Sequence, residues 1–276
     1  MFLLSKFAIW LIAWPRALWR DRELLWALSR REMNQKYKGS ALGIAWSVVT
    51  PLAMLTVYTF VFTGVFRARW PGADANNPLA FGLNLFTGLI VFNTFAEVMT
   101  RAPDAMHVSK NLVKKVVFPL EMITVSYAFS SIIQSLVSLV VLFVALILSE
   151  NTFSIHWIGI LIIWIPLLNF NIAVGWLLAT LGAYSRDVGH LTAVSTNLIL
   201  FMSAVFYPIS ALPIKIQWVA EINPIATIIA EARSILIHKN MFDANFLVLA
   251  FASSYLGCCF AYSFFKKSSK TFADFI

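Results

Sequence analysis

Acidic side chains, which most hydrolytic and transfer chemistry requires, are sparse and widely spaced in this sequence. An enzyme acting on sugars or phosphates at a membrane needs two carboxylates in one site, or a group of metal ligands on a loop. No Asp-x-Asp pair occurs, and the acids of one set of connecting segments are scattered: Asp74, Glu150, Glu221, Glu231 and Asp243. The sequence therefore argues against a lipid-linked glycosyltransferase, and we expect no catalytic residue and no metal site.

Nucleotide and thiol chemistry are not indicated either. The sequence has no Gly-rich phosphate-binding loop that ends in Gly-Lys-Ser or Gly-Lys-Thr. A process driven by ATP would therefore need a second polypeptide to hydrolyse it, and we expect no cofactor on this chain. Cys258 and Cys259 are adjacent within an apolar run, a spacing that suits neither a disulfide nor a metal site, so we expect both to be packing residues.

Long apolar segments must position the remaining polar residues. Of the 276 residues 60% are hydrophobic and only 12% are charged, with a mean hydropathy of +0.79. A soluble domain carries about a quarter charged residues, and a transmembrane helix needs about 20 apolar ones. The sequence therefore predicts an all-α integral membrane protein with six spans, at about 41–66, 78–97, 121–149, 157–184, 190–207 and 244–265.

The interiors of these predicted spans hold no Asp, Glu, Lys or Arg. Ion-coupled transporters and channels usually carry such groups inside the membrane, so this class is disfavoured. Before the last span, residues 208–240 are apolar but interrupted by Pro213, Pro224 and several charges. We expect two short helices here that re-enter the membrane, which is possible only where protein or water satisfies the broken backbone.

The positive charge is distributed unevenly among the connecting segments. Segments 1–38, 97–121, 186–190 and 266–276 hold 16 of the 21 Lys and Arg residues, and the alternate segments hold the rest. By the positive-inside rule both termini are then cytoplasmic. The formal charge of +8 is explained by contact with anionic membrane lipid, and we expect no nucleic-acid partner.

We expect residues 1–38 to form a basic N-terminal arm before a single transmembrane domain at 39–276. Its apolar residues Trp14, Ala17, Leu18, Leu24, Leu25 and Leu28 share one helical face, opposite Arg16, Arg20, Glu23, Arg30 and Arg31. This pattern predicts an amphipathic helix that lies in the membrane interface. The cations Arg30, Arg31, Lys36 and Lys38 could attract a phosphate headgroup, or could serve only as topology signals.

Two short basic segments connect spans on the predicted cytoplasmic side. Between Pro103 and Pro119 we expect about four turns of helix, too short and too basic to span. It could hold a cytoplasmic partner, or it could be a loop resting on lipid headgroups. The second segment contains Arg186 and Asp187, which could cap helix ends or pair with neighbours.

Polar and aromatic residues within the spans are candidates for a channel lining. Ser126, Ser130 and Gln134 recur every fourth residue and form a stripe on one helix, which could face a wet channel or could pack small residues against another helix. Aromatic rings stack on sugars without demanding one sequence. The aromatic residues in or near spans are Tyr58, Phe62, Trp176, Phe201, Phe206 and Tyr207. Taken singly, each is more often a core or lipid-facing residue than a channel residue.

Four motifs together resemble those of polysaccharide-exporting ABC transporter permeases. Residues 31–46 (REMNQKYKGSALGIAW) resemble the family's N-terminal motif, and residues 111–121 (NLVKKVVFPLE) resemble its first coupling helix. Residues 186–188 (RDV) resemble its second cytoplasmic contact, and residues 221–224 (EINP) its re-entrant segment. The motifs are most similar to those of O-antigen (lipopolysaccharide) exporters, with capsule and teichoic acid exporters as neighbours.

The resemblance implies a fold, a function and partners. It implies a homodimer of six-span subunits in the bacterial inner membrane, paired with two copies of an ATPase that binds ATP and Mg²⁺. The assembly would move a lipid-linked polysaccharide outward, and a non-ABC secondary transporter is the less favoured alternative. The residues that the resemblance assigns to ATPase coupling are Asn111, Leu112, Lys114, Lys115, Val116, Phe118, Arg186 and Asp187.

Overall fold

The computed structural model describes residues 2–71, 79–114, 118–150 and 154–276, and in these ranges every regular element is a helix. Five helical segments are long and apolar enough to cross a membrane. They are Gly43–Val65 (η1, α3 and η2), Ala80–Arg101 (α4), Glu121–Ser149 (within α7, Glu121–Glu150), Ile155–Tyr184 (η3 and α8) and Ala244–Ser268 (α12). The all-helical prediction and five of the predicted spans are confirmed.

The sixth predicted span, at 190–207, corresponds to a shorter helix. Helix α9, Asp187–Met202, has 16 residues and so rises about 24 Å, less than the roughly 30 Å of a hydrocarbon core. It ends where Ser203 leaves helical geometry and Ala204 takes a positive φ of 52°. A sixth span therefore stays a prediction.

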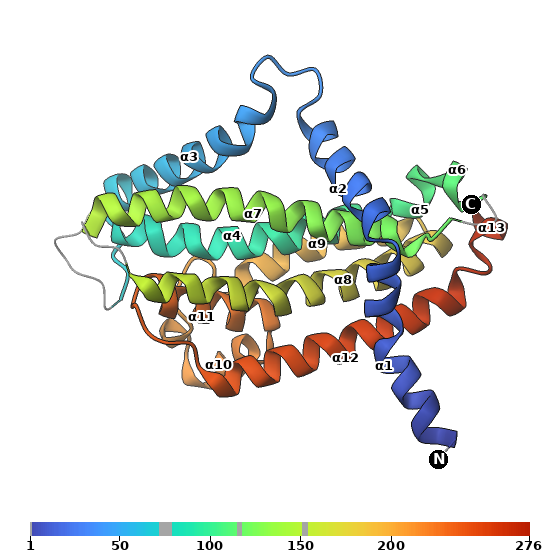
Figure 1. Ribbon diagram of the computed structural model, residues 1–276. Helices are drawn as coiled ribbons and strands as arrows, with labels where there is room; N and C mark the ends of the chain where they lie inside the picture. Colours follow the sequence, from blue (N-terminus) through green and yellow to red (C-terminus); the bar gives the residue numbers. More distant parts are fainter. Residues whose placement is uncertain (1, 72–78, 115–117, 151–153) are drawn as a thin grey trace.

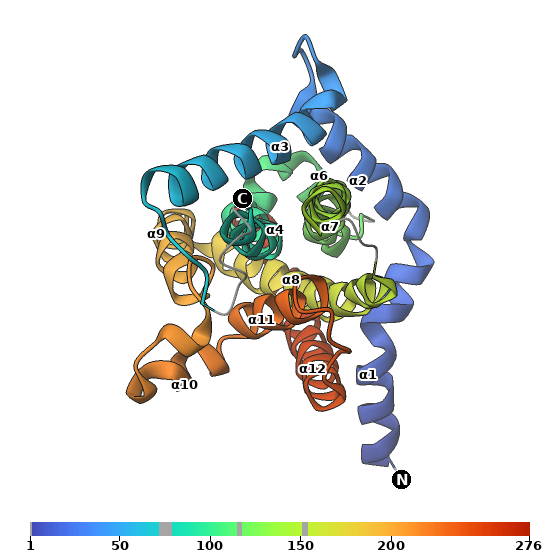
Figure 2. The ribbon, with the colours of Figure 1, turned by 90° about the vertical axis from the view of Figure 1, so that its left-hand side faces the viewer.

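Helices α4, α7 and α8 form the centre of the bundle, with α7 antiparallel to the other two (Figure 1). Helix α4 is the most enclosed of the five candidate spans, and Gly43–Val65, which includes α3 (Trp46–Thr59), is the least: 83% and 6% of their apolar windows are buried. Figure 2 shows α3 lying across α4 and α7. A side chain at Gly82 of α4 would meet Thr59 Oγ1 at 2.0 Å, so this glycine permits the close approach of α3.

The connecting segments gather at two opposite ends of the bundle. One end, here called the α5 end, carries α5 (Ala105–Val108), α6 (Lys110–Val113) and α13 (Phe272–Phe275) (Figure 1). The other, the α10 end, carries α10 (Ile214–Ile222) and the last residues of α7 and α9 (Figure 1). The basic residues of α6, of the start of α9 and of the C-terminal segment thus lie at the α5 end, as the charge asymmetry predicts, while the basic N-terminal arm crosses the side of the bundle (Figure 1). That this end faces the cytoplasm stays a prediction.

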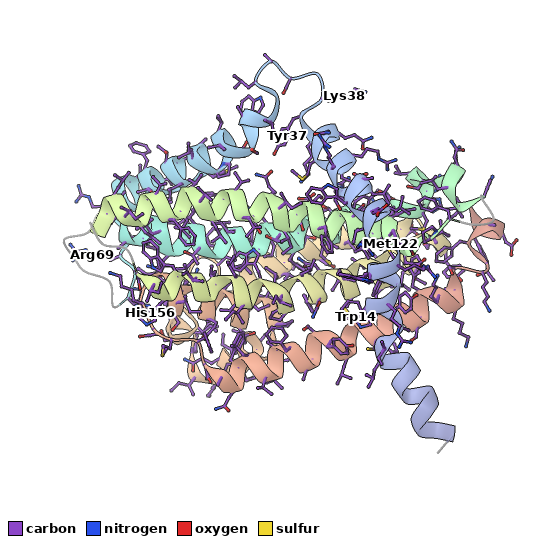
Figure 3. All side chains as sticks on the ribbon, viewed as in Figure 1. Trp14, Tyr37, Lys38, Arg69, Met122 and His156 are labelled. Atoms are coloured by element: carbon purple, nitrogen blue, oxygen red, sulfur yellow. The ribbon has the colours of Figure 1, made fainter. Side chains whose placement is uncertain are left out.

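The N-terminal arm consists of two helices, α1 (Phe2–Arg20) and α2 (Arg22–Tyr37). Its amphipathic pattern is confirmed, since Trp14, Ala17, Leu25 and Leu28 are buried. These side chains pack in one core with residues of α4, α7, α8 and α12, and Figure 3 shows Trp14 where α1 crosses the bundle. The apolar face therefore covers the chain's own helices, and placement in the membrane interface stays a prediction.

Residues 208–240 form two short helices, as predicted, after a single turn at Ile209–Ala211 (η4). They are α10, Ile214–Ile222, and α11, Pro224–Leu236. Asn223 caps α11 by accepting a hydrogen bond from the Ile225 amide, and Pro224 occupies the first turn, where no amide donor is needed. Whether these helices re-enter the membrane stays a prediction.

Candidate functional site

A network of ionised side chains joins α2 to α4. The Arg101 guanidinium bonds to Glu32 of α2 and to Glu97 Oε1 at 3.2 Å, and it lies over the Tyr127 ring at 4.2 Å. Lys36 Nζ completes the network at 2.6 Å from Glu97 Oε1. Glu97 and Arg101 lie in the last turns of α4, which continues past the predicted span end at residue 97 to Arg101. These long-range pairs hold the arm against the bundle.

The four cations predicted to attract a lipid headgroup have different surroundings. Lys36 is engaged with Glu97, and Arg31 is 3.2 Å from Glu32. Arg30 and Lys38 are exposed, and Lys38 lies just beyond the end of α2 (Figure 3). If a headgroup binds here, Arg30 and Lys38 are the residues available without breaking an ion pair.

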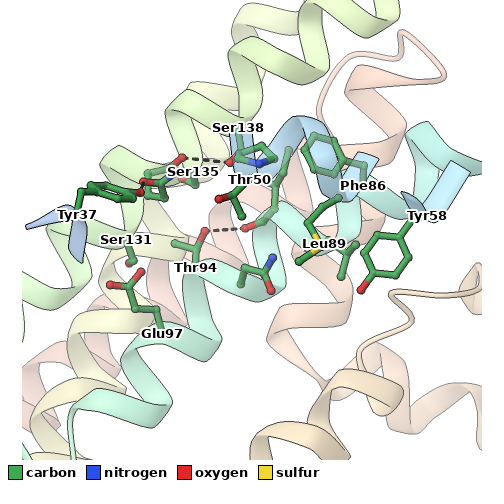
Figure 4. Close-up of a pocket in the computed structure, with 15 residues that line it drawn as sticks. Tyr37, Thr50, Tyr58, Phe86, Leu89, Thr94, Glu97, Ser131, Ser135 and Ser138 are labelled. Carbon is green, nitrogen blue, oxygen red and sulfur yellow. Dashed lines mark hydrogen bonds between the residues drawn. The ribbon is translucent and has the colours of Figure 1, made fainter. Parts of the chain in front are cut away.

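Next to this network, a polar cavity of about 280 Å³ lies between α3, α4 and α7 (Figure 4). Gln134 of α7 organises one wall by accepting a hydrogen bond from Tyr37 Oη at 2.8 Å and donating to the Ser47 carbonyl at 2.9 Å. Burial raises the pKa of Tyr37, so its phenol stays protonated and able to donate. Glu97 lines the same cavity, so the ion-pair network forms its border.

The members of the polar stripe on α7 have different surroundings. Gln134 lines the cavity, but Ser126 and Ser130 are buried and donate to the carbonyls of Ile123 and Tyr127 within their own helix. In this chain the two serines follow the packing alternative, and a channel-lining role for the stripe stays a prediction. The reason for the different surroundings is geometric: at 3.6 residues per turn, residues eight apart differ by about 80° in direction. The stripe therefore winds off the cavity toward the core.

Four of the six aromatic candidates form one cluster at the α10 end. Ring centroids are 6.3 Å apart for Tyr58 and Phe62, 6.2 Å for Phe62 and Phe206, and 5.5 Å for Phe201 and Phe206. The same cluster includes Phe81 of α4, stacked on Phe62 at 5.1 Å. Since Tyr58 also lines the polar cavity, this aromatic cluster continues from it.

The other two aromatic candidates lie elsewhere. Trp176 is fully buried, and its indole donates to the Glu121 carbonyl at 3.1 Å, as expected of the core alternative. Its edge packs against Trp14, and it belongs to the core that holds the arm. Tyr207 packs beside a small cluster of alanines near α10.

At the α5 end, the segment after Pro103 differs from the predicted continuous helix of four turns. It consists of α5 and α6, each of four residues, separated at Ser109 with φ −102° and ψ 24°. Lys115 and Val116 lie outside the described residues. Asn111 and Lys114 are exposed, as a partner contact requires.

Two apolar members of this segment face inward. Leu112 and Phe118 are half-buried against the chain's own core, so little of either side chain is free to contact a partner. The sequence reasoning overlooked Val108, whose surface is 77% exposed at the end of α5. Val108 is therefore the best apolar anchor for a partner among the described residues of this segment.

The structure brings the two predicted contact segments together. Arg186 borders a small polar cavity with Asp104, His107 and His190, so the start of α9 adjoins α5. Asp187 is exposed beside it. A side chain at Gly182 of α8 would meet the Pro103 carbonyl at 2.0 Å, so the backbone just before α5 lies directly against the end of α8. His107 of α5 also forms a hydrogen bond with the Gly182 carbonyl at 3.1 Å.

The C-terminal tail packs against the end of α8, next to Arg186. Tyr184, the last residue of α8, donates or accepts a hydrogen bond with Thr271 Oγ1 at 2.8 Å. Its ring makes edge contacts with Phe272 at 6.0 Å and Phe275 at 4.9 Å, and Phe272 is fully buried. The tail thus fixes the residue that leads into Arg186. Sequence reasoning missed this support, although the spacing of two Phe residues after a basic helix end was visible.

A buried arginine stabilises the irregular backbone at the α10 end. Arg233 of α11 is 5% exposed and donates to the carbonyls of Asn84, Ala204 and Val205 at 3.0, 2.8 and 2.6 Å. Its guanidinium also lies over the Trp70 ring at 4.4 Å. These carbonyls include two that follow the end of α9, so Arg233 supplies donors that the helix no longer provides. The sequence marked Arg233 only as an interruption.

Metal and thiol chemistry find no support in the part of the chain described. There, no group of three or more His, Cys, Asp or Glu side chains could hold a metal ion. Cys258 and Cys259 are free and buried in the core around Trp176, as expected of packing residues.

Comparison of the sequence with known proteins gives a family match and several relatives. The profile of the ABC-2 type transporter family matches residues 23–237. An O-antigen export system permease protein RfbA of Klebsiella pneumoniae is 25% identical over 255 residues, covering 92% of this chain and 95% of the relative. The RfbA permease protein of Myxococcus xanthus is 25% identical over 263 residues, covering 95% and 98%.

Proposed function

The chain belongs to the ABC-2 type transporter family, and from that premise we propose that it is the permease subunit of an ATP-driven O-antigen exporter. Its cargo is a lipid-linked polysaccharide moved outward across the bacterial inner membrane. Two copies of this chain form the membrane domain, and two copies of a separate ATPase supply the energy. Export of capsule or teichoic acid by the same class of machine is the alternative cargo.

The observation that carries the proposal is the polar and aromatic path along α4. It begins at the Glu97 network, passes through the polar cavity and ends at the aromatic cluster around Phe62. Such a path presents hydroxyls, amides and ring faces without a demand for one ligand, as a conduit for a moving polymer requires. The candidates that fit this role are Tyr58, Phe62, Gln134, Phe201 and Phe206.

Energy must reach this path mechanically, because the sequence has no nucleotide-binding loop. The α5 end offers Val108, Asn111 and Lys114 as exposed contacts for an ATPase. The segment that carries them lies against α8 through the backbone contact at Gly182. A displacement of α5 is therefore transmitted to α8 and on to the bundle.

The proposal is tested with Val108→Asp in cells that also produce the ATPase. Burying an exposed valine in a partner's groove stabilises the complex by about 1–3 kcal/mol. An aspartate in the same groove would destabilise the complex. We expect loss of polysaccharide export and loss of ATPase in the purified complex, with normal membrane insertion.

The matched control is Met241→Asp, at a side chain 76% exposed at the opposite end, which should change neither readout. If Val108→Asp retained both the ATPase and export, the coupling surface would be wrong. If the wild-type complex turned over ATP yet never moved polysaccharide to the outer leaflet, the assigned function itself would be wrong.

A further inference from the structure

We infer that the polar cavity between α3, α4 and α7 binds a single uncharged sugar residue and disfavours acidic sugars. The inference rests on the proposed function and deepens it, because it names the class of polysaccharide that the same path accepts. It follows from three properties of the cavity: which hydrogen-bonding groups are free, where the charges lie, and how large the space is.

The cavity offers free neutral hydrogen-bonding groups to a ligand. The Thr50 hydroxyl, the Tyr58 hydroxyl and the Asn93 amide line it, and none has a hydrogen-bond partner among the described residues. Ser131 and Ser138 donate their protons to backbone carbonyls of α7, which leaves their oxygen lone pairs available. A sugar hydroxyl can both donate and accept, so it can use every one of these groups.

The charges around the cavity disfavour an anion. Glu97 is the only ionisable carboxyl on the wall, and no lysine or arginine is among the described lining residues. The nearest cations, Lys36 and Arg101, are directed at Glu97 and Glu32. A uronic acid or a phosphate-bearing sugar would bring a second negative charge beside Glu97, and no lining lysine or arginine would compensate it.

The size and shape of the cavity suit one sugar ring. Its volume of about 280 Å³ is at the lower limit of small-molecule sites, which occupy about 300–1,000 Å³. Tyr58 and Phe86 contribute aromatic surface to the wall (Figure 4), against which the apolar face of a pyranose can pack. One residue of a polymer therefore fits at a time, which is compatible with movement of the chain past the site.

The test is saturation-transfer difference NMR on the purified protein in lipid nanodiscs. The ligands are the methyl glycosides of glucose, galactose, mannose and rhamnose, each compared with methyl glucuronide and methyl galacturonide. We expect saturation transfer to at least one neutral glycoside, and at least tenfold weaker binding of both acids. No binding of any neutral glycoside, or equal binding of the acids, would overturn the inference.

Variants show whether the sugar binds in this cavity, and they separate the effect of the neutral hydrogen-bonding groups from the effect of the Glu97 charge. Thr50→Val and Asn93→Ala should each weaken neutral-sugar binding several-fold. Thr56→Val is the matched control on the same helix, because the Thr56 hydroxyl donates to the Leu52 carbonyl and does not line the cavity. Glu97→Gln should reduce the ratio between the affinity for neutral glycosides and the affinity for acidic glycosides.

These outcomes are distinguishable from a failure of the proposed function. Neutral binding unchanged by Thr50→Val and Asn93→Ala would place the site elsewhere, while the export assay with the ATPase could still succeed. Binding with the expected selectivity in a complex that exports no polysaccharide would leave the site standing and refute the transport assignment.

Discussion

Replacing Arg233 by methionine should unfold the α10 end locally while the rest of the bundle stays intact. Arg233 is the common donor to the backbone of Asn84 in α4 and of Ala204 and Val205 after α9. Methionine has a similar length and fills the space but donates no hydrogen bond. The three carbonyls would then be left buried without these donors.

The loss of local stability can be estimated from the hydrogen bonds removed and from the desolvation cost of the guanidinium that is no longer present. A buried acceptor left unsatisfied costs about 1–3 kcal/mol, so three of them cost about 3–9 kcal/mol. Removing the buried guanidinium recovers part of this, because its own desolvation was unfavourable by several kcal/mol. A net loss of about 3 kcal/mol would raise the open population of this segment by roughly a hundredfold, since 1.4 kcal/mol corresponds to a factor of ten.

Hydrogen exchange measured by mass spectrometry on the protein in nanodiscs reads out this opening. Peptides over residues 203–213 and 224–236 should exchange about a hundredfold faster in Arg233→Met, and peptides from α7 should be unchanged. The exchange rate of these peptides in Arg233→Lys should lie between those of the wild type and Arg233→Met, because one ammonium group cannot reach all three carbonyls as the guanidinium does. Lys215→Met, on exposed α10, is the control. Unchanged exchange at 203–213 in Arg233→Met would refute the account of the irregular backbone.

Two further predictions concern the α5 end. Gly182→Ala should separate α5 from α8, because the added methyl would lie 2.0 Å from the Pro103 carbonyl; ATPase activity should then continue without export, and intact export would contradict this contact. Phe272→Ala should free Tyr184 by removing a fully buried ring, at a cost of about 3–5 kcal/mol; limited proteolysis should cleave the tail faster, and an unchanged cleavage rate would show that the tail is held by other contacts.

Features that depend on nearest neighbours along the chain were predictable. Runs of about 20 apolar residues predicted five of the spans within a few residues of their ends, because hydrophobic length is a local property. The two short helices around Pro224 followed from the proline and the Asn cap. The separation of basic and non-basic segments to opposite ends followed from their alternation between spans.

The direction of a side chain around its helix axis was not predictable in the same way. The stripe from Ser126 to Gln134 was visible in the sequence, but only packing against α3 and α4 decided that Gln134 faces the cavity and Ser126 the core. The amphipathic arm was likewise recognised, whereas its partner was taken to be lipid. Its composition suits contact with lipid or with protein, and only the fold shows that Trp14, Ala17, Leu25 and Leu28 pack on the chain's own helices.

What the sequence by itself determined is the helical membrane class, most of the spans and the resemblance that led to the family. Tertiary structure alone decided the pairs that are far apart in the chain: Glu32 with Arg101, Gly182 with Pro103, and Arg233 with Asn84. The physical reason is that apolar length and charge alternation act within one helix or one loop, where the sequence displays them directly. A hydrogen bond or a close backbone contact between distant segments forms only when the packing partners of each helix and its rotation about its own axis are fixed.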